Sequence, residues 1–393
     1  MNKETSLHEE MEHRRTRVRE ALHRAGADAC LIGTNVNLFY LTGKVFAGYC
    51  YMPAEGEPRL FVKRPQPFDG ENVFFIRKPE DLADHFAAAG LAMPRTLWLE
   101  TDEIPYNECL RLLSTFRSPE TGNASILMRR VRMIKTAREI AEMRYSAARH
   151  VATYAEVAAC FRPGMTDLEF QAEIERRMRL NGSLGIFGVY GHQMNIFMGS
   201  VLAGSNAGAP SPFDFALGGE GQTPLCPVGA NGTAIREGMT VMVDMAGNYS
   251  PYLTDMTRVF SVGQAPDEAE RAHRVSLDIQ DDFVRTARPG VSCAALYNRA
   301  LEIAVKAGLK DFFMGTRQQA KFTGHGIGLH INEPPVLSPR STDELQAGMT
   351  IALEPKFVLP GIGAAGVENS FLVTETGVEK LTVFEEAIIP LLP

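Results

Sequence analysis

The sequence predicts an α/β (α+β) protein of two domains, the second built as an internal repeat around antiparallel strands. Three observations support this fold class: the length of 393 residues, an alternation of helix-like and strand-like stretches up to about residue 128, and a helix-rich pattern that occurs twice afterwards. Hydrophobic residues make up 45% of the chain, which is enough to fill more than one core. We therefore expect domains at residues 1–128 and 129–393.

Short apolar runs between helical segments define the expected first domain. An amphipathic helix is predicted from His8 to Arg24, and Gly26 ends it. Four strand-like runs and one further helix follow before residue 100. The strands are expected at 29–33, 59–62, 73–76 and 96–99, and the helix at 80–89.

Charge and composition exclude several classes of partner. The net charge is −7, and the 40 basic residues form no block, so no nucleic-acid partner is expected. The N-terminus lacks the apolar core of a signal peptide, and no run approaches the ~18 apolar residues of a membrane span. We expect a cytoplasmic protein without a membrane partner. The six cysteines show no CxxC spacing, so a metal would use oxygen and nitrogen donors.

The internal repeat is indicated by two copies of the same helix-stop-helix pattern. A helix predicted over 137–160 ends at Arg162-Pro163-Gly164, and Thr166 caps the next helix. A second helix ends at Arg288-Pro289-Gly290, and Ser292 caps its successor. Each copy leads into strands that carry one pair of acidic residues, which a pseudo-two-fold axis would bring together.

Each acidic pair is predicted to lie on a β-hairpin. A turn at Asn248–Pro251 would place Asp244 directly opposite Asp255, with their side chains on one face. A turn centred on Gly361 would place Glu354 opposite Glu368 in the same way. Carboxylates in such proximity repel each other unless a cation lies between them.

The glycine-flanked His325 is the predicted nitrogen ligand of the same site. Gly324, Gly326 and Gly328 allow another strand to approach closely. Four carboxylates bring about four negative charges together, which two divalent ions would offset. Manganese, iron or cobalt suits these donors, and two such ions with a bridging water can activate that water for amide hydrolysis.

These motifs resemble those of the creatinase, prolidase and aminopeptidase P group of metallopeptidases, which have the pita-bread fold. The resemblance implies a small creatinase-like N-terminal domain over 1–128 and a catalytic pita-bread domain over 129–393. It rests on Asn37–Gly43, Arg132–Lys135, Asp255-Met256-Thr257-Arg258, Gly324–Leu329 and Glu354-Pro355-Lys356.

The resemblance implies a Xaa-Pro dipeptidase or aminopeptidase that acts on short proline-containing peptides as a homodimer. Two divalent ions are implied, manganese first and cobalt, iron or zinc as alternatives. Glu354 would be the general base, with His325 as the second catalytic residue. The implied metal ligands are Asp244, Asp255, His325, Glu354 and Glu368.

The chain departs from the family pattern at three positions. The family commonly has histidines where this chain has Ser211 and Asn332, and an arginine near Gly366. Those groups bind the substrate carbonyl and stabilise the tetrahedral intermediate, and losing one such donor costs roughly 10²-fold to 10³-fold in rate. The substrate-binding candidates in this chain are Tyr190, His192, Ser211, His330 and Asn332.

Two alternatives to peptide hydrolysis follow from these departures. One is a dinuclear metallohydrolase or lyase of the same fold that acts on a small non-peptide metabolite. The other is a catalytically silent binding protein, and the presence of all five ligand residues argues against it.

Overall fold

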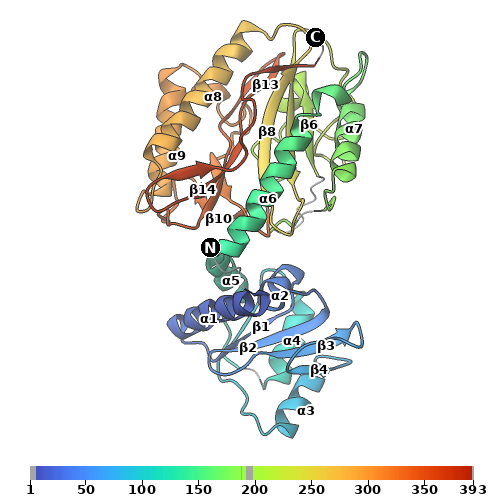
Figure 1. Cartoon of the computed structure of the whole chain (residues 1–393), viewed down its shortest axis with the longest axis vertical. Helices are drawn as coiled ribbons and strands as arrows, with labels where there is room; N and C mark the ends of the chain where they lie inside the picture. The colour runs from blue at the N-terminus through green and yellow to red at the C-terminus, as the bar shows by residue number, and fades with distance from the viewer. Residues whose placement is uncertain (1–5, 118, 187, 192–197, 392–393) are drawn as a thin grey trace. The chain divides into compact units, whose positions relative to one another are not determined.

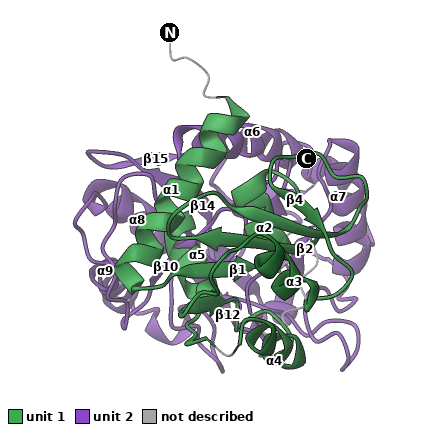
Figure 2. Ribbon diagram, turned by 90° about the horizontal axis from the view of Figure 1, so that it is seen from below, with its two compact units in different colours: residues 1–132 green, residues 133–393 purple. Residues whose placement is uncertain are grey.

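A computed structural model describes residues 6–117, 119–186, 188–191 and 198–391 (Figure 1). The chain divides into two compact units, Met1–Arg132 and Met133–Pro393 (Figure 2). The domain boundary predicted after residue 128 lies within helix α5 (Ala124–Arg132), four residues before the division between the units. Among the helices of the described segments, none has the length and hydrophobicity that crossing a membrane requires.

The first unit is built on a mixed five-stranded sheet in the order β4-β3-β2-β1-β5. The central strands β1, β2 and β3 are antiparallel neighbours, whereas β4 and β5 add in parallel at the edges. The strands are β1 (Ala29–Ile32), β2 (Ala47–Pro53), β3 (Arg59–Arg64), β4 (Val73–Phe75) and β5 (Leu97–Leu99). The other helices of this unit are α1 (Leu7–Ala25), α2 (Asn35–Thr42), α3 (Asp81–Ala88) and α4 (Tyr106–Thr115).

Two sheets and a hairpin form the centre of the second unit. The first sheet has the order β16-β8-β7-β6, and the second has the order β10-β9-β11-β14-β15. The first contains β6 (Gly199–Ala203), β7 (Thr240–Gly247), β8 (Thr254–Ser261) and β16 (Ile389–Pro390). The second contains β9 (Gly324–Gly326), β10 (Glu333–Leu337), β11 (Thr350–Leu353), β14 (Asn369–Val373) and β15 (Val378–Lys380), and β12 (Lys356–Leu359) pairs with β13 (Gly363–Gly366) in the hairpin.

Two pairs of helices flank these strands. In the second unit, α6 and α7 lie on one side of the strands, and α8 and α9 lie on the other (Figure 1). Helix α6 packs on β7 and β8, while α8 packs on β12 and β13. The helices are α6 (Ala137–Tyr154), α7 (Asp167–Leu180), α8 (Asp267–Thr286) and α9 (Cys293–Lys306), with 3-10 turns η1 (Ala158–Cys160), η2 (Gly204–Gly208) and η3 (Lys310–Phe312).

The predicted internal repeat is visible in matching backbone contacts. At the start of α7, the amide of Asp167 donates to the carbonyl of Thr233 at 2.9 Å. At the start of α9, the amide of Cys293 donates to the carbonyl of Asp343 at the same distance. In each copy the accepting segment leads directly into a central strand, β7 in the first and β11 in the second. The α/β fold with a duplicated second half is therefore confirmed.

His150 on α6 should make the stability of the fold sensitive to acid. Its side chain is fully buried with Nδ1 3.1 Å from the hydroxyl of Thr254, and Nε2 has no hydrogen-bond partner among the described residues. Burial, with the nearby positive charge of Arg258, lowers the pKa of His150 to about 3. The unfolded chain binds this proton below about pH 6.5 and the folded chain does not, so stability falls as the pH drops through that range.

Replacing the imidazole by an amide should remove this contribution. We expect the difference in unfolding free energy between wild type and His150→Gln to shift by about 2 kcal/mol, in favour of the variant, from pH 8 to pH 5. Urea denaturation at the two pH values measures the shift, and the pH 8 value controls for the change in packing. An identical difference at both values would contradict the assignment.

Candidate metal centre

The first acidic pair lies on one face of the β7–β8 hairpin, in a register different from the predicted one. Asp244 is opposite Thr257, and Asp255 is opposite Ala246. The prediction that the two aspartates oppose each other directly is wrong, because the connection runs from Asn248 to Leu253 and moves the centre of the turn. A shift of two residues preserves the face, so the aspartates are diagonal neighbours on the same side of the sheet.

The second acidic pair has the predicted register. Leu353 pairs with Asn369 between β11 and β14, and Lys356 pairs with Gly366 between β12 and β13. Both ladders have the same register, and Glu354 and Glu368 lie opposite each other where the two ladders meet. The predicted opposition centred on Gly361 is confirmed.

Helix α8 holds the backbone at this break between ladders. The side-chain amide of Gln280 donates to the carbonyls of Leu353 and Val367, at 2.9 Å each. One turn earlier, the hydroxyl of Ser276 donates to the carbonyl of Pro355 at 2.6 Å. These two side chains replace the hydrogen bonds between strands that are missing here. The backbone can therefore depart from regular strand pairing at the acids without leaving buried carbonyls unsatisfied.

His325 presents one ring nitrogen to the acids. It lies in β9, between β10 and β11, and its Nδ1 is 3.0 Å from the carbonyl oxygen of Gly326. A carbonyl only accepts, so Nδ1 carries a proton, and the lone pair of the neutral ring is then on Nε2. Nε2 lies 3.5 Å from Oε1 of Glu354. Gly326 makes this possible, because a β-carbon there would lie 2.1 Å from the carbonyl oxygen of Pro334.

The five predicted ligand residues are brought together in two overlapping sets. Ligand atoms of Asp255, His325 and Glu368 lie within 4.8 Å of one another, and so do those of Asp244, Glu354 and Glu368. Glu368 belongs to both sets. Its Oε1 is buried and has no hydrogen-bond partner within the described part of the chain, whereas its Oε2 accepts from the hydroxyl of Thr257 at 2.7 Å.

The first of these sets fits a divalent metal ion. It combines two carboxylates, from Asp255 and Glu368, with the unprotonated nitrogen of His325, a donor mixture that suits manganese, iron or cobalt. The unpaired oxygen of Glu368 is a buried acceptor that a cation would satisfy. Burial raises the pKa of Asp255 well above its usual range, and the charges of Glu368 and Asp244 raise it further. A bound metal ion would offset the electrostatic repulsion between these carboxylates.

The second set already contains a cation, the ammonium group of Lys356. Its Nζ lies 2.7 Å from Asp244 Oδ2, 2.7 Å from Glu354 Oε2 and 3.0 Å from Glu368 Oε2. Burial opposes the charged ammonium, but the three carboxylates outweigh it and raise the pKa of Lys356. The sequence-based interpretation gave Lys356 no role in the site. Its position two residues after Glu354 was the available signal, since such residues share a face of a strand.

A buried arginine fixes the segment between β13 and β14 that carries Glu368. The guanidinium of Arg258 donates to the carbonyls of Thr257 and Glu368, at 2.8 and 2.9 Å, and to the side chain of Asn369 at 3.0 Å. The amide of Glu368 in turn donates to the carbonyl of Thr257 at 3.3 Å, which joins β8 to the β13–β14 segment. Arg258 thereby connects the two acidic pairs through backbone groups.

The predicted substrate-binding residues fall into separate local arrangements. The side-chain amide of Asn332 donates to the carbonyl of Tyr190 at 2.6 Å and accepts from its amide at 2.8 Å. The buried His330 lies 6.3 Å from the ring of Tyr190 between centroids. Ser211 is also buried, and its hydroxyl accepts from the amide of Phe213 at 3.1 Å. His192 lies outside the described residues.

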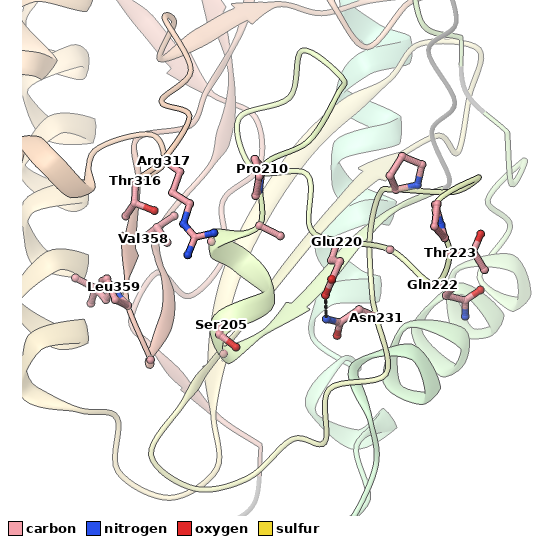
Figure 3. Close-up of a pocket in the computed structure, with 18 residues that line it drawn as sticks. Ser205, Pro210, Glu220, Gln222, Thr223, Asn231, Thr316, Arg317, Val358 and Leu359 are labelled. Atoms are coloured by element: carbon pink, nitrogen blue, oxygen red, sulfur yellow. Dashed lines mark hydrogen bonds between the residues drawn. The ribbon is translucent and has the colours of Figure 1, made fainter.

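An open groove of about 1110 Å³ lies beside the hairpin of β12 and β13 (Figure 3). Arg317, Pro210 and Val358 contribute to its wall, and Glu220 accepts from the side chain of Asn231 at 2.9 Å along it. Among the described residues that line the groove, none is one of the five predicted ligands. The groove is therefore not the metal centre itself.

Comparisons with known proteins place the chain in a family. The sequence profile of metallopeptidase family M24 matches residues 141–375, more than half of the chain. The chain belongs to this family. The creatinase/prolidase N-terminal domain matches residues 14–134 of the same M24 chain. Family membership supports a metal-dependent peptidase.

Relatives and solved structures match the M24 chain along nearly its whole length. An uncharacterized peptidase of Staphylococcus aureus (strain USA300) is 25% identical over 388 residues, which cover 94% of this chain and 99% of the relative. The structure of a Xaa-Pro dipeptidase from Bacillus anthracis has a TM-score of 0.79 at 23% identity, with coverage of 97% and 99%. A prolidase from Pyrococcus horikoshii OT3 has a TM-score of 0.76 at 22% identity, with coverage of 95% and 99%. These structures confirm the pita-bread fold.

Gly366 offers a test of the packing around the acids. Its φ is 143°, and a β-carbon there would lie 2.5 Å from the carbonyl oxygen of Pro355. A side chain at this position therefore requires the backbone beside Glu354 to move. We expect Gly366→Ala to cost about 1–3 kcal/mol more than Gly361→Ala, whose φ is also positive but whose β-carbon would meet nothing within 4 Å. Equal losses in urea denaturation would show that the close approach is unimportant.

Proposed function

We propose that this M24 chain hydrolyses the bond before proline in Xaa-Pro dipeptides or short peptides, with a divalent metal ion. The observation that carries the proposal is that the five candidate ligand residues form two overlapping sets, and the ligand atoms of each set lie within 4.8 Å of one another. The residues come from both halves of the repeat. Solved structures that match at least 94% of the chain are a prolidase, a Xaa-Pro dipeptidase and an X-Pro aminopeptidase, which favours proline-containing substrates.

Asp255, His325 and Glu368 would hold the metal ion. When bound, a divalent ion polarises the substrate carbonyl and lowers the pKa of water, so that water attacks near neutral pH. The protein positions the ligand side chains and shields them from bulk solvent. Strand pairing supplies the rigidity of His325, and Arg258 with Thr257 supplies that of Glu368.

Glu354 is the proposed general base. Its Oε2 accepts from Lys356 at 2.7 Å, which leaves Oε1, 3.5 Å from His325 Nε2, as the oxygen that takes a proton. Glu354 would remove a proton from the attacking water and return it to the nitrogen of the leaving proline as the peptide bond breaks. Only 4% of Glu354 is exposed, so this proton is shielded from bulk solvent.

A small non-peptide metabolite is the second candidate substrate class. It is favoured by Asn332, where the family commonly has a histidine and where this chain uses the side chain to pair with the backbone of Tyr190. The buried hydroxyl of Ser211 accepts from a neighbouring amide in the same local manner. Hydrolysis of a small amide would need the same metal and base but fewer groups around the substrate carbonyl.

Further elements of the proposal concern the ion and the assembly. We propose manganese as the native ion because the donors are oxygen-rich, with cobalt, iron or zinc as alternatives. A homodimer and a cytoplasmic location complete the proposal. Size-exclusion chromatography with light scattering measures the first of these two, and cell fractionation measures the second.

The proposed base and substrate class can be tested together. The manganese-loaded wild type is expected to cleave Xaa-Pro dipeptides and to leave the matched Xaa-Ala dipeptides largely uncut. Glu354→Gln should lower kcat by about 10²-fold to 10⁴-fold, because an amide takes no proton from water. Glu375→Gln, at an exposed position after β14, is the matched control and should leave kcat unchanged.

Two results would count against this assignment. If the fully metal-loaded wild type cleaves neither dipeptide, the proposed Xaa-Pro hydrolysis is refuted and a non-peptide amide becomes the favoured substrate class. A Glu354→Gln variant with wild-type kcat would show that another group removes the proton.

A further inference from the structure

We propose that the centre holds a single metal ion, bound by Asp255, His325 and Glu368, and that the Lys356 ammonium permanently takes the place of a second ion. The inference rests on the proposed metal-dependent function and specifies its centre. It departs from the two-ion site that the sequence predicts.

The contacts of Lys356 coincide with the second ligand set. Its Nζ lies within hydrogen-bond distance of Asp244, Glu354 and Glu368, the three residues whose carboxylates would bind a second ion. An ammonium group has three N–H donors, and each of them meets a different carboxylate. A metal ion could enter this set only by displacing Nζ.

The backbone around Lys356 keeps the ammonium in this position. Lys356 begins β12 on the same face as Glu354, and its carbonyl accepts from the amide of Met314 at 2.8 Å. On the paired strand, Gly366 approaches so closely that a β-carbon would overlap Pro355. Only 1% of the Lys356 side chain is exposed, so water does not compete with the carboxylates for the ammonium in this position.

Glu368 divides its two oxygens between the two cations. Oε2 accepts from Lys356 at 3.0 Å and from Thr257, whereas Oε1 is buried without a hydrogen-bond partner among the described groups. In a two-ion centre such a shared carboxylate would bridge the metals. Here one oxygen faces the ammonium, and the other is available to the one ion, with Asp255 and His325.

The charges also favour one ion. The four carboxylates carry about four negative charges, and the ammonium with one divalent ion offsets about three of them. A second divalent ion would have to displace the ammonium or share its three carboxylates, and like charges that share the same carboxylates repel each other strongly. One ion leaves about one net negative charge, and it shares only Glu368 with the ammonium, so the repulsion between the cations is smaller than for a second ion in the set of Asp244, Glu354 and Glu368.

The test is the number of ions bound per chain. The purified full-length protein is loaded with excess manganese, desalted, and measured by inductively coupled plasma mass spectrometry and by native mass spectrometry. We expect one ion per wild-type chain and two per Lys356→Ala chain, a twofold increase. Lys135→Ala is the matched control, since Lys135 is also a buried lysine paired with a carboxylate, 3.1 Å from Glu333, and its loss should leave the count at one.

A second readout does not depend on the variant's folding. Electron paramagnetic resonance of the loaded wild type should show isolated Mn²⁺ and no exchange-coupled pair. Two ions per wild-type chain, a coupled signal, no bound ion, or a folded Lys356→Ala protein that still binds one would each overturn the inference. These outcomes are separate from the peptidase proposal, because a wild type with one ion and no Xaa-Pro activity would refute the substrate and leave the ion count intact.

Discussion

The mutual repulsion of four clustered carboxylates, three of them buried and Asp244 partly exposed, is the constraint on which the second unit depends. Asp244, Asp255, Glu354 and Glu368 come from both halves of a duplicated fold and meet where two sheets join. Isolated buried charges are too costly to persist unless cations and hydrogen bonds compensate them. The surrounding features can be understood as that compensation: the ammonium of Lys356, the guanidinium of Arg258 and the hydroxyl of Thr257 all contact the acids or the backbone that carries them.

Much of the fold and the clustering of the five candidate ligand residues could be predicted from the sequence because both follow from local patterns. The turn centred on Gly361 placed Glu354 opposite Glu368 correctly, since a short turn fixes the register of the strands that it joins. The longer connection between β7 and β8 does not fix it, and there the register is two residues away from the predicted one. In the first unit, β2 was not predicted, because it includes Gly48 and ends at Pro53, and both residue types weaken a strand pattern.

The groups that tune the site could not be predicted in the same way. Lys356 could be assigned to the face of Glu354 by alternation, but that its ammonium reaches Asp244 and Glu368 as well depends on the path of the side chain in the fold. Gln280 and Ser276 lie on α8 and look like ordinary polar positions of an amphipathic helix. Their role depends on the break between ladders. Long-range polar contacts of this kind leave no periodic signal in one sequence.

The Lys356 ammonium affects how the occupancy of the metal site depends on the concentration of free metal. A centre that needs two free ions is filled in proportion to the square of a low metal concentration, whereas a centre that needs one is filled in direct proportion. The ammonium of Lys356 is attached to β12 by covalent bonds, so it cannot be lost by dilution or removed by a chelator. When metal is scarce, such a chain would keep one of the two cations of its site, the ammonium. It would regain activity on binding a single metal ion.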